Sequence, residues 1–320
     1  MENKTTERYL IPASILISSI LIASSWVYSA GVKSGTQSKA GIVSSKEKLV
    51  SELEEKVLPF EGVTLPVVWG GLGARLVSDG VIDAAKLKNL YEQRGSFTDE
   101  YKNLLLGNNN GKLKMTGDNA GYLLNLLWAL GLANKNTILE TGEMADPKYG
   151  GAQNFASTGG WTIAKGSPMD HYSRHVLFEL TPEQQALVDK VSRGIYRPCC
   201  GNSTHFPDCN HGMAMLGLLE LMASQGVSEQ DMWKTALVVN SYWFPDTYLT
   251  IATYMKDKGI DWQNVNPQEV LGANYSSASG YARISSQVVA PNNSRGGSGC
   301  GVDAGQPAPA PQRQQGGCGI

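Results

Sequence analysis

The stretch GDNAGYLLNLLWALGLA, residues 117–133, decides the fold class. Asp118 is its single charged residue, and Leu, Ala, Tyr and Trp fill most of the other positions. Thr116 precedes it and can cap a helix, because its hydroxyl can accept a hydrogen bond from a backbone N–H of the first turn. A helix that is apolar on every face has to be buried. The sequence therefore predicts a central core helix here.

Helix signals recur on both sides of this stretch, whereas alternating strand patterns are few. Only residues 60–77 are compatible with a short strand. The positions that can start helices are Ser, Thr, Asp or Asn residues, or a proline in the first turn. They are Asp83, Thr98, Ser167-Pro168, Thr181-Pro182 with Gln184, Asp208 or Asn210, Ser228 and Pro245. We therefore expect a mainly α fold, with a single helical domain over residues 49–275.

The N-terminus predicts a membrane segment. Residues 9–27, YLIPASILISSILIASSWV, contain no charge and are about long enough to span a bilayer core. Lys4 and Arg8 precede them, so residues 1–30 are expected to be a cytoplasmic stub with an uncleaved anchor. The rest of the chain would be extracytoplasmic, or secreted if the segment is instead a cleaved signal peptide. Residues 31–48, rich in Gly, Ser and Lys, resemble a flexible stalk.

The C-terminal region differs in composition. Residues 276–320 are dominated by Gly, Pro and polar residues, which cannot bury enough apolar area to offset chain entropy, so we expect a disordered tail. Cys300 and Cys318 lie in it, each between glycines. They are candidate delivery or redox thiols, or incidental cysteines. The net charge of -2 leaves no basic excess for binding nucleic acid.

The chemistry concentrates in RPCCGNSTHFPDCNHG, residues 197–212. Thiolates and imidazoles are ligands for zinc, copper or iron–sulfur clusters. The spacing matches no standard zinc motif, since no C-x2-C pair is present. Cys209 is expected at the start of a helix, where free N–H groups and the helix dipole favour a thiolate. The candidate ligands in this segment are Cys199, Cys200, Cys209 and His211, with His205 as a secondary candidate.

Two other uses of the same cysteines compete with a metal site. A structural disulfide could join Cys199 or Cys200 to Cys209, because exported chains meet oxidising compartments. A thiol–disulfide protein would use Cys209 as the nucleophile and Cys199 or Cys200 as its resolving partner. The sequence leaves the three possibilities open.

A second histidine pair lies in DHYSRHVLFE, residues 170–179. His171 and His175 are four residues apart on a predicted helix, so they would share a face and offer two more metal ligands. A zinc peptidase would need Glu directly after the first histidine, where this chain has Tyr172. Neither this segment nor the rest of the chain carries a recognisable catalytic base, so we expect a binding protein more than an enzyme.

Taken together, the sequence favours a membrane-anchored, extracytoplasmic metal-binding protein for copper or zinc, with a metal or thiol donor protein as partner. The alternatives are a thiol–disulfide redox protein and a non-catalytic surface or scaffold domain with a structural disulfide.

Overall fold

The computed structural model of the chain describes residues 51–288. The chain divides into two units, residues 1–52 and 53–320, and nearly all described residues belong to the second. That unit is mainly helical, which confirms the predicted fold class. Within residues 51–288, none of the helices has both the length and the apolar character that crossing a bilayer requires. The expected anchor at 9–27 and the stalk at 31–48 lie outside the described residues.

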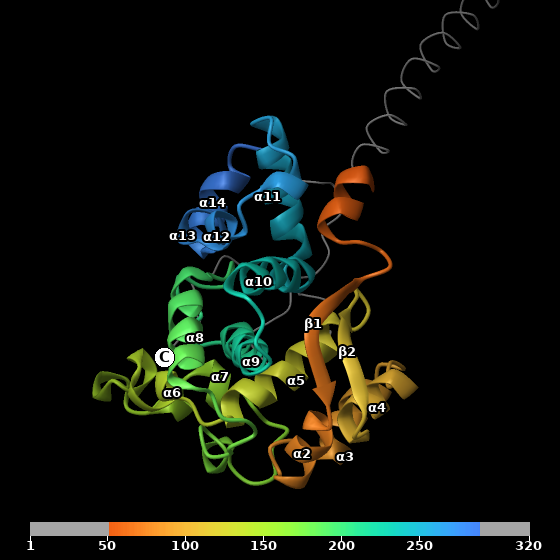
Figure 1. Ribbon diagram of the computed structural model, residues 1–320, viewed down its shortest axis with the longest axis vertical. Coiled ribbons are helices and arrows are strands. Elements are labelled where there is room, and N and C mark those ends of the chain that lie inside the picture. The colour runs from red at the N-terminus through yellow and green to blue at the C-terminus, as the bar shows by residue number, and fades with distance from the viewer. Residues whose placement is uncertain (1–50, 289–320) are drawn as a thin grey trace, which may run out of the picture. The chain divides into compact units, whose positions relative to one another are not determined.

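The elements of the second unit are shown in Figure 1. The sheet strands and longer helices are β1 (Val63–Gly70), α2 (Leu72–Ser78), α3 (Ala84–Glu92), α4 (Asp99–Leu106), β2 (Asn110–Met115), α5 (Ala120–Ala133), α8 (Pro182–Gly194), α9 (Asn210–Ser224), α10 (Glu229–Trp243), α11 (Pro245–Asp257) and α14 (Ala278–Ser285). The short helices are α6 (Thr137–Thr141), α7 (Ala156–Gly159), α12 (Pro267–Leu271) and α13 (Ala273–Ser276), with 3₁₀ turns η1 (Glu143–Ala145), η2 (Pro147–Tyr149), η3 (Ala152–Asn154), η4 (Pro168–Asp170) and η5 (Trp262–Asn264).

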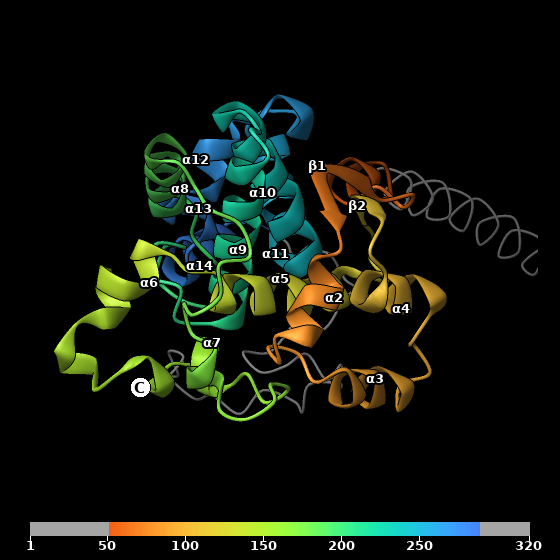
Figure 2. The same cartoon turned by 60° about the horizontal axis from the view of Figure 1, so that its bottom comes forward.

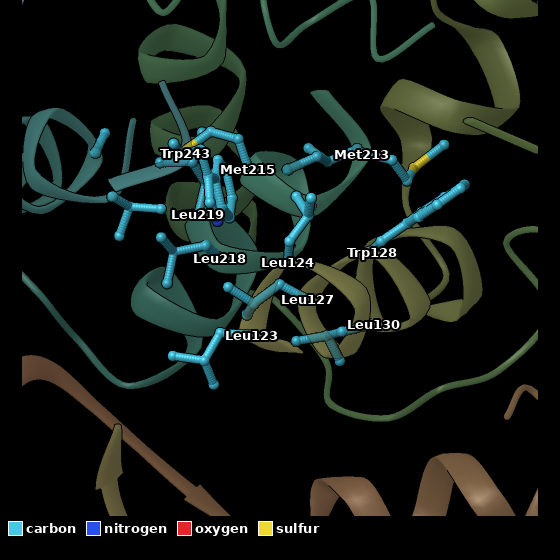
Figure 3. Close-up of a cluster of buried hydrophobic side chains, with 14 of the residues drawn as sticks. Leu123, Leu124, Leu127, Trp128, Leu130, Met213, Met215, Leu218, Leu219 and Trp243 are labelled. Carbon is cyan, nitrogen blue, oxygen red and sulfur yellow. The ribbon is translucent and has the colours of Figure 1, made fainter. Parts of the chain in front are cut away.

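The predicted core helix, α5, packs against α9 at the centre of this unit (Figure 3). Leu123, Leu124 and Leu127 of α5 face apolar side chains of α9, and all are at most 1% exposed. The two helix backbones nearly touch at Gly131 and Gly217, because a Cβ atom built on Gly217 would lie 2.5 Å from the carbonyl oxygen of Leu127. No side chain separates the helices there, so their relative position is tightly fixed.

The remaining elements surround this helix pair. Helices α8 and α10 pack beside α9, and α11–α14 extend the same side (Figures 1 and 2). The strands β1 and β2 form an antiparallel pair beside α2–α4 at the other side. Residues 60–77 were compatible with a strand, and β1 confirms it. Strand β2 was not expected, since Asn110 looked like part of a loop; its side-chain amide donates instead to the Gly70 carbonyl at the end of β1.

The predicted capping residues are largely confirmed. The side chains of Asp83, Thr98, Thr181 and Ser228 each accept a backbone N–H at the start of a helix. Thr116 does not cap α5 directly, because the helix begins at Ala120. The Thr116 hydroxyl and the Asn119 side chain instead each accept the other residue's backbone N–H in the preceding turn. The central helix therefore starts one turn later than the sequence suggests.

Two further expectations are corrected. Ser167 does cap a turn, but the predicted helix at 171–179 is absent, because η4 ends at Asp170 and Ser173 adopts a positive φ of 52°. The first residues of the expected tail at 276–320 are helical instead, since α14 spans Ala278–Ser285. Ile284 of α14 is 4% exposed, and Gly280 packs directly against the backbone of Ala273. Close packing at a small residue thus orders a segment whose composition resembles a linker.

A buried carboxyl group joins α9 to the end of α5. Glu220 is 0% exposed, and each of its oxygens accepts one hydrogen bond of 2.8 Å, from the side-chain amides of Asn134 and Asn136. Burial raises the pKa of Glu220 well above its usual range, although the two amide donors oppose that shift. These contacts join the C-terminal half of α9 to the residues that follow α5.

Candidate metal centre

The cysteine-containing segment folds into a loop between α8 and α9. The loop turns back on itself through an isolated bridge between Tyr196 and Ser203. Two backbone hydrogen bonds fasten it to the C-terminal helices: the Tyr196 N–H donates to the Leu271 carbonyl at 2.8 Å, and the Ala278 N–H donates to the Cys200 carbonyl at 2.9 Å. Residues beyond the predicted domain boundary at 275 therefore help to shape this site.

Cys209 lies at the start of α9, as expected, but it is itself the N-cap, where the sequence suggested Asp208 or Asn210. Its side chain is fully buried, and its Sγ accepts a hydrogen bond of 3.4 Å from the backbone N–H of Gly212. A sulfur in this position lies at the positive end of the helix dipole. The fold thus places Cys209 where a thiolate is stabilised.

Two further cysteines and a histidine converge on this sulfur. The Sγ atoms of Cys199 and Cys209 are 3.7 Å apart, and the ligand atoms of Cys199, Cys209 and His211 all lie within 4.8 Å of one another. A second group of the same compactness contains Cys200, Asp208 and Cys209. None of the three cysteines forms a disulfide. These residues could bind a metal ion, and Cys209 is common to both groups.

An ion pair between Arg197 and Asp208 is buried beside the sulfurs. The Arg197 Nη2 lies 2.6 Å from Asp208 Oδ1, and neither side chain exceeds 8% exposure. The same nitrogen donates to Cys200 Sγ at 3.3 Å, and Asn202 donates to the other Asp208 oxygen at 2.8 Å. Burying charges is expensive unless each has partners. This network therefore fixes Cys200 on one side of Cys209.

The environment separates the protonation of the thiols. Hydrogen bonds with Cys199 and Cys200, together with the charge of Arg197, hold the pKa of Cys209 well below its usual range despite full burial. A hydrogen bond with Cys199 lowers the pKa of Cys200, but the hydrogen bond with Cys209 and burial outweigh it and raise that pKa to about 11. Cys209 therefore loses its proton more readily than Cys200.

His211 is the least satisfied polar group at the site. It is fully buried, and neither ring nitrogen has a hydrogen-bond partner among the described residues. Its proximity to Cys209 contributes only weakly to the low pKa of that thiol, and the contact lacks hydrogen-bond geometry. The rings of Phe244 and Trp243 lie 4.4 Å and 5.7 Å from the imidazole. Buried polar atoms are nearly always paired, so this imidazole lacks an acceptor or a ligand.

His205 lies in the same loop but faces away from the sulfurs. Its Nε2–H donates to Asp189 of α8 at 2.8 Å, and its Nδ1 lies 3.7 Å from a carboxylate oxygen of Glu143. Neither compact ligand group among the described residues contains it. The contacts of His205 thus anchor the loop to α8.

His171 and His175 meet each other, although no helix carries them. The His171 Nδ1 and His175 Nε2 are 3.0 Å apart, and the His171 Nε2–H donates to the Lys165 carbonyl at 2.9 Å. The other His175 nitrogen lies 3.7 Å from Asp79. Neither compact ligand group within residues 51–288 joins this pair to the cysteines. The two histidines therefore share no compact ligand group with the cysteines among the described residues.

Sequence reasoning missed Arg197 and gave Asp208 only a capping role. Both flank the cysteines in RPCC and PDC, and that adjacency is the one signal that could have identified them. Cys300 and Cys318 lie outside the described residues. A comparison of the chain with known protein families, with curated proteins and with solved structures found no match.

Proposed function

We propose that this chain is a metal-binding protein that holds copper or zinc at Cys199, Cys209 and His211. The observation that carries the proposal is His211, whose two ring nitrogens are fully buried without a hydrogen-bond partner. An imidazole beside thiol sulfurs acquires a favourable partner when a soft or borderline metal ion binds between them.

The sulfur geometry supports the same proposal. Two thiolates on one tetrahedral zinc ion lie about 3.8 Å apart, given Zn–S bonds of about 2.3 Å. The Cys199 and Cys209 sulfurs are 3.7 Å apart, whereas a disulfide requires about 2.05 Å. The two thiols can therefore coordinate a common ion without rearrangement, while oxidation would need them to move closer together.

The partner and the location belong to the proposal. The membrane segment expected at 9–27 would tether the site outside the cytoplasm. Cys199 is the partly exposed ligand and Cys209 is buried, so an incoming ion would meet Cys199 first. A donor protein with thiol ligands could then pass its ion by exchange at Cys199, and Cys300 or Cys318 could do so from within the chain.

A thiol–disulfide function is the second candidate, and the low pKa of Cys209 favours it. Burial nevertheless assigns the roles differently from the sequence. The partly exposed Cys199 would have to attack the substrate disulfide, and the buried Cys209 thiolate would then resolve the mixed disulfide.

The test compares two buried histidines, His205 of the loop and His211 of the first turn of α9, in the full-length chain, purified in detergent without oxygen or chelators. His211→Gln should abolish stoichiometric copper or zinc binding, because it removes a ligand nitrogen. His205→Gln is the matched control, which should lose stability through Asp189 but retain the metal. Metal content and free thiols are measured in both variants.

Equal metal binding in the two variants would refute the role of His211. A metal-free chain that rapidly forms a Cys199–Cys209 disulfide with a small disulfide reagent, and is reduced again by a dithiol, would favour the redox function instead.

A further inference from the structure

The number of ligands that the fold brings together bears on which metal fits. Three ligand atoms, those of Cys199, Cys209 and His211, lie mutually within 4.8 Å. The ligand atom of Cys200 lies within 4.8 Å of those of Asp208 and Cys209, but Cys200 and His211 belong to no common group. The fold therefore presents two sulfurs and one nitrogen in one group, and the Cys200 sulfur in a second group that shares only Cys209 with the first.

Arg197 binds that third sulfur. Its Nη2 donates to Cys200 Sγ at 3.3 Å, and the same nitrogen also donates to the Phe206 carbonyl and to Asp208. Recruiting Cys200 as a fourth ligand would break its contact with Arg197, which argues for coordination by the three residues whose ligand atoms already lie close together.

Zinc takes four protein ligands in structural sites, and in catalytic sites with three protein ligands it adds a water as the fourth, whereas thiolate-rich sites with soft ligands select copper(I). Resting on the function proposed above, we infer that this site takes a monovalent soft ion, copper(I), in three-coordinate geometry on Cys199, Cys209 and His211. Phe244 and Trp243 pack against the imidazole of His211, and Cys209 is fully buried. Apolar side chains would therefore shield a bound ion from solvent on the His211 side.

Binding balances in charge and protons. The Cys209 thiolate binds directly, Cys199 binds as a thiolate after releasing any proton it carries to solvent, and His211 coordinates through a neutral ring nitrogen. The copper stays in the cuprous state, so no oxidant or reductant takes part. Cys200 keeps its proton and its contact with Arg197.

The experiment uses the full-length chain carrying Cys300→Ser and Cys318→Ser, so that every available thiol lies in the loop. Copper(I) and zinc(II) are each titrated anaerobically against a chromophoric chelator of known affinity. X-ray absorption of the copper(I) form then counts the bound atoms. We expect one copper(I) per chain with two sulfur neighbours and one nitrogen neighbour, bound more tightly than zinc.

Variants identify the ligands. Cys209→Ser, Cys199→Ser and His211→Gln should each weaken copper(I) binding by more than the roughly 10–100-fold that loss of an outer-shell partner costs. Cys200→Ser should keep two sulfur neighbours and one nitrogen neighbour on the copper, and should weaken binding by no more than the roughly 10–100-fold of an outer-shell partner, because Cys200 hydrogen-bonds with Cys209. If a variant at a buried ligand fails to fold, the number of sulfur neighbours that X-ray absorption finds on copper in the chain with all three loop cysteines still tests three-coordinate binding.

The outcomes separate this inference from the function on which it rests. Tighter zinc binding through four ligands that include Cys200 would overturn the copper(I) assignment and leave a metal-binding protein. Three sulfur neighbours on copper would also overturn it. Binding of neither metal would overturn both.

Discussion

The contact between α5 and α9 gives a quantitative prediction for Gly217→Ala. The added Cβ would lie 2.5 Å from the Leu127 carbonyl oxygen and 2.6 Å from the Gly131 nitrogen. Both are backbone atoms, which cannot rotate away. Increasing the first distance to an ordinary contact of 3.4 Å requires the helices to separate by 3.4 − 2.5 = 0.9 Å. A radial gap of that size forfeits a quarter to a half of each dispersion contact across it.

The expected cost follows from these distances. Overpacking of a core costs about 1–3 kcal/mol, and the rigid backbone neighbours place this site at the upper end. Replacing glycine with alanine within a helix returns about 1 kcal/mol. The net loss of stability is therefore about 2 kcal/mol, which lowers the melting temperature by roughly 4–8 °C for a domain of this size.

Thermal unfolding followed by circular dichroism measures the effect. Gly117→Ala is the control, because a Cβ at that position would meet no atom within 4 Å. If Gly217→Ala melts at the same temperature as the Gly117→Ala control, the close approach of the two helices is not a feature of the protein.

Three further predictions concern titrating groups. Burial raises the pKa of Glu220, so its protonated form stabilises the fold at low pH, and this stabilisation is lost as pH rises from about 4.3 through the folded pKa. In urea unfolding, the free energy of unfolding should fall less between pH 5 and pH 8 in Glu220→Gln than in the native chain. Burial lowers the pKa of His175, so acidification below about pH 6.5 should destabilise the native chain. The free energy of unfolding in urea should fall more over this pH range in the native chain than in the His175→Gln variant. In a pH titration of the metal-free protein followed by ultraviolet absorbance, a first thiolate should form at a pH below the ordinary range of a cysteine thiol. Cys209→Ser should remove this first step and Cys200→Ser should not.

Much of the helical framework follows from local signals. Capping residues such as Asp83 and Thr181 act within a few residues of their own position, so the sequence contains the whole interaction. The expected helix around His171 failed because periodicity records spacing and not the backbone path. The positive φ at Ser173 breaks that path, while contacts with Lys165 and Asp79 bring the histidines together from outside the segment.

The cysteine site could be predicted in part. The residue types and the helix start at Cys209 are visible in the sequence. The sequence does not show which cysteines group with His211 and which with Asp208. That grouping depends on Arg197, whose side chain packs against Gly212 and donates to Cys200. The sequence does not distinguish a buried arginine from an exposed one, because the burial of Arg197 depends on its pairing with Asp208 in the folded chain. His205 and His211 are likewise equivalent in sequence, and only the position of α8 separates them.

The fastening of the cysteine loop to the last helices has a consequence for synthesis. Ala278 holds Cys200 through a backbone hydrogen bond, and 278 − 200 = 78 residues separate the two along the chain. A ribosome adding about 5–20 residues per second leaves Cys200 without that contact for roughly 4–16 s. During this interval the three cysteines have been synthesised, but the C-terminal helices that pack against their loop have not. The nascent chain is therefore most vulnerable to mispairing or to capture of a wrong ion before its C-terminal helices emerge.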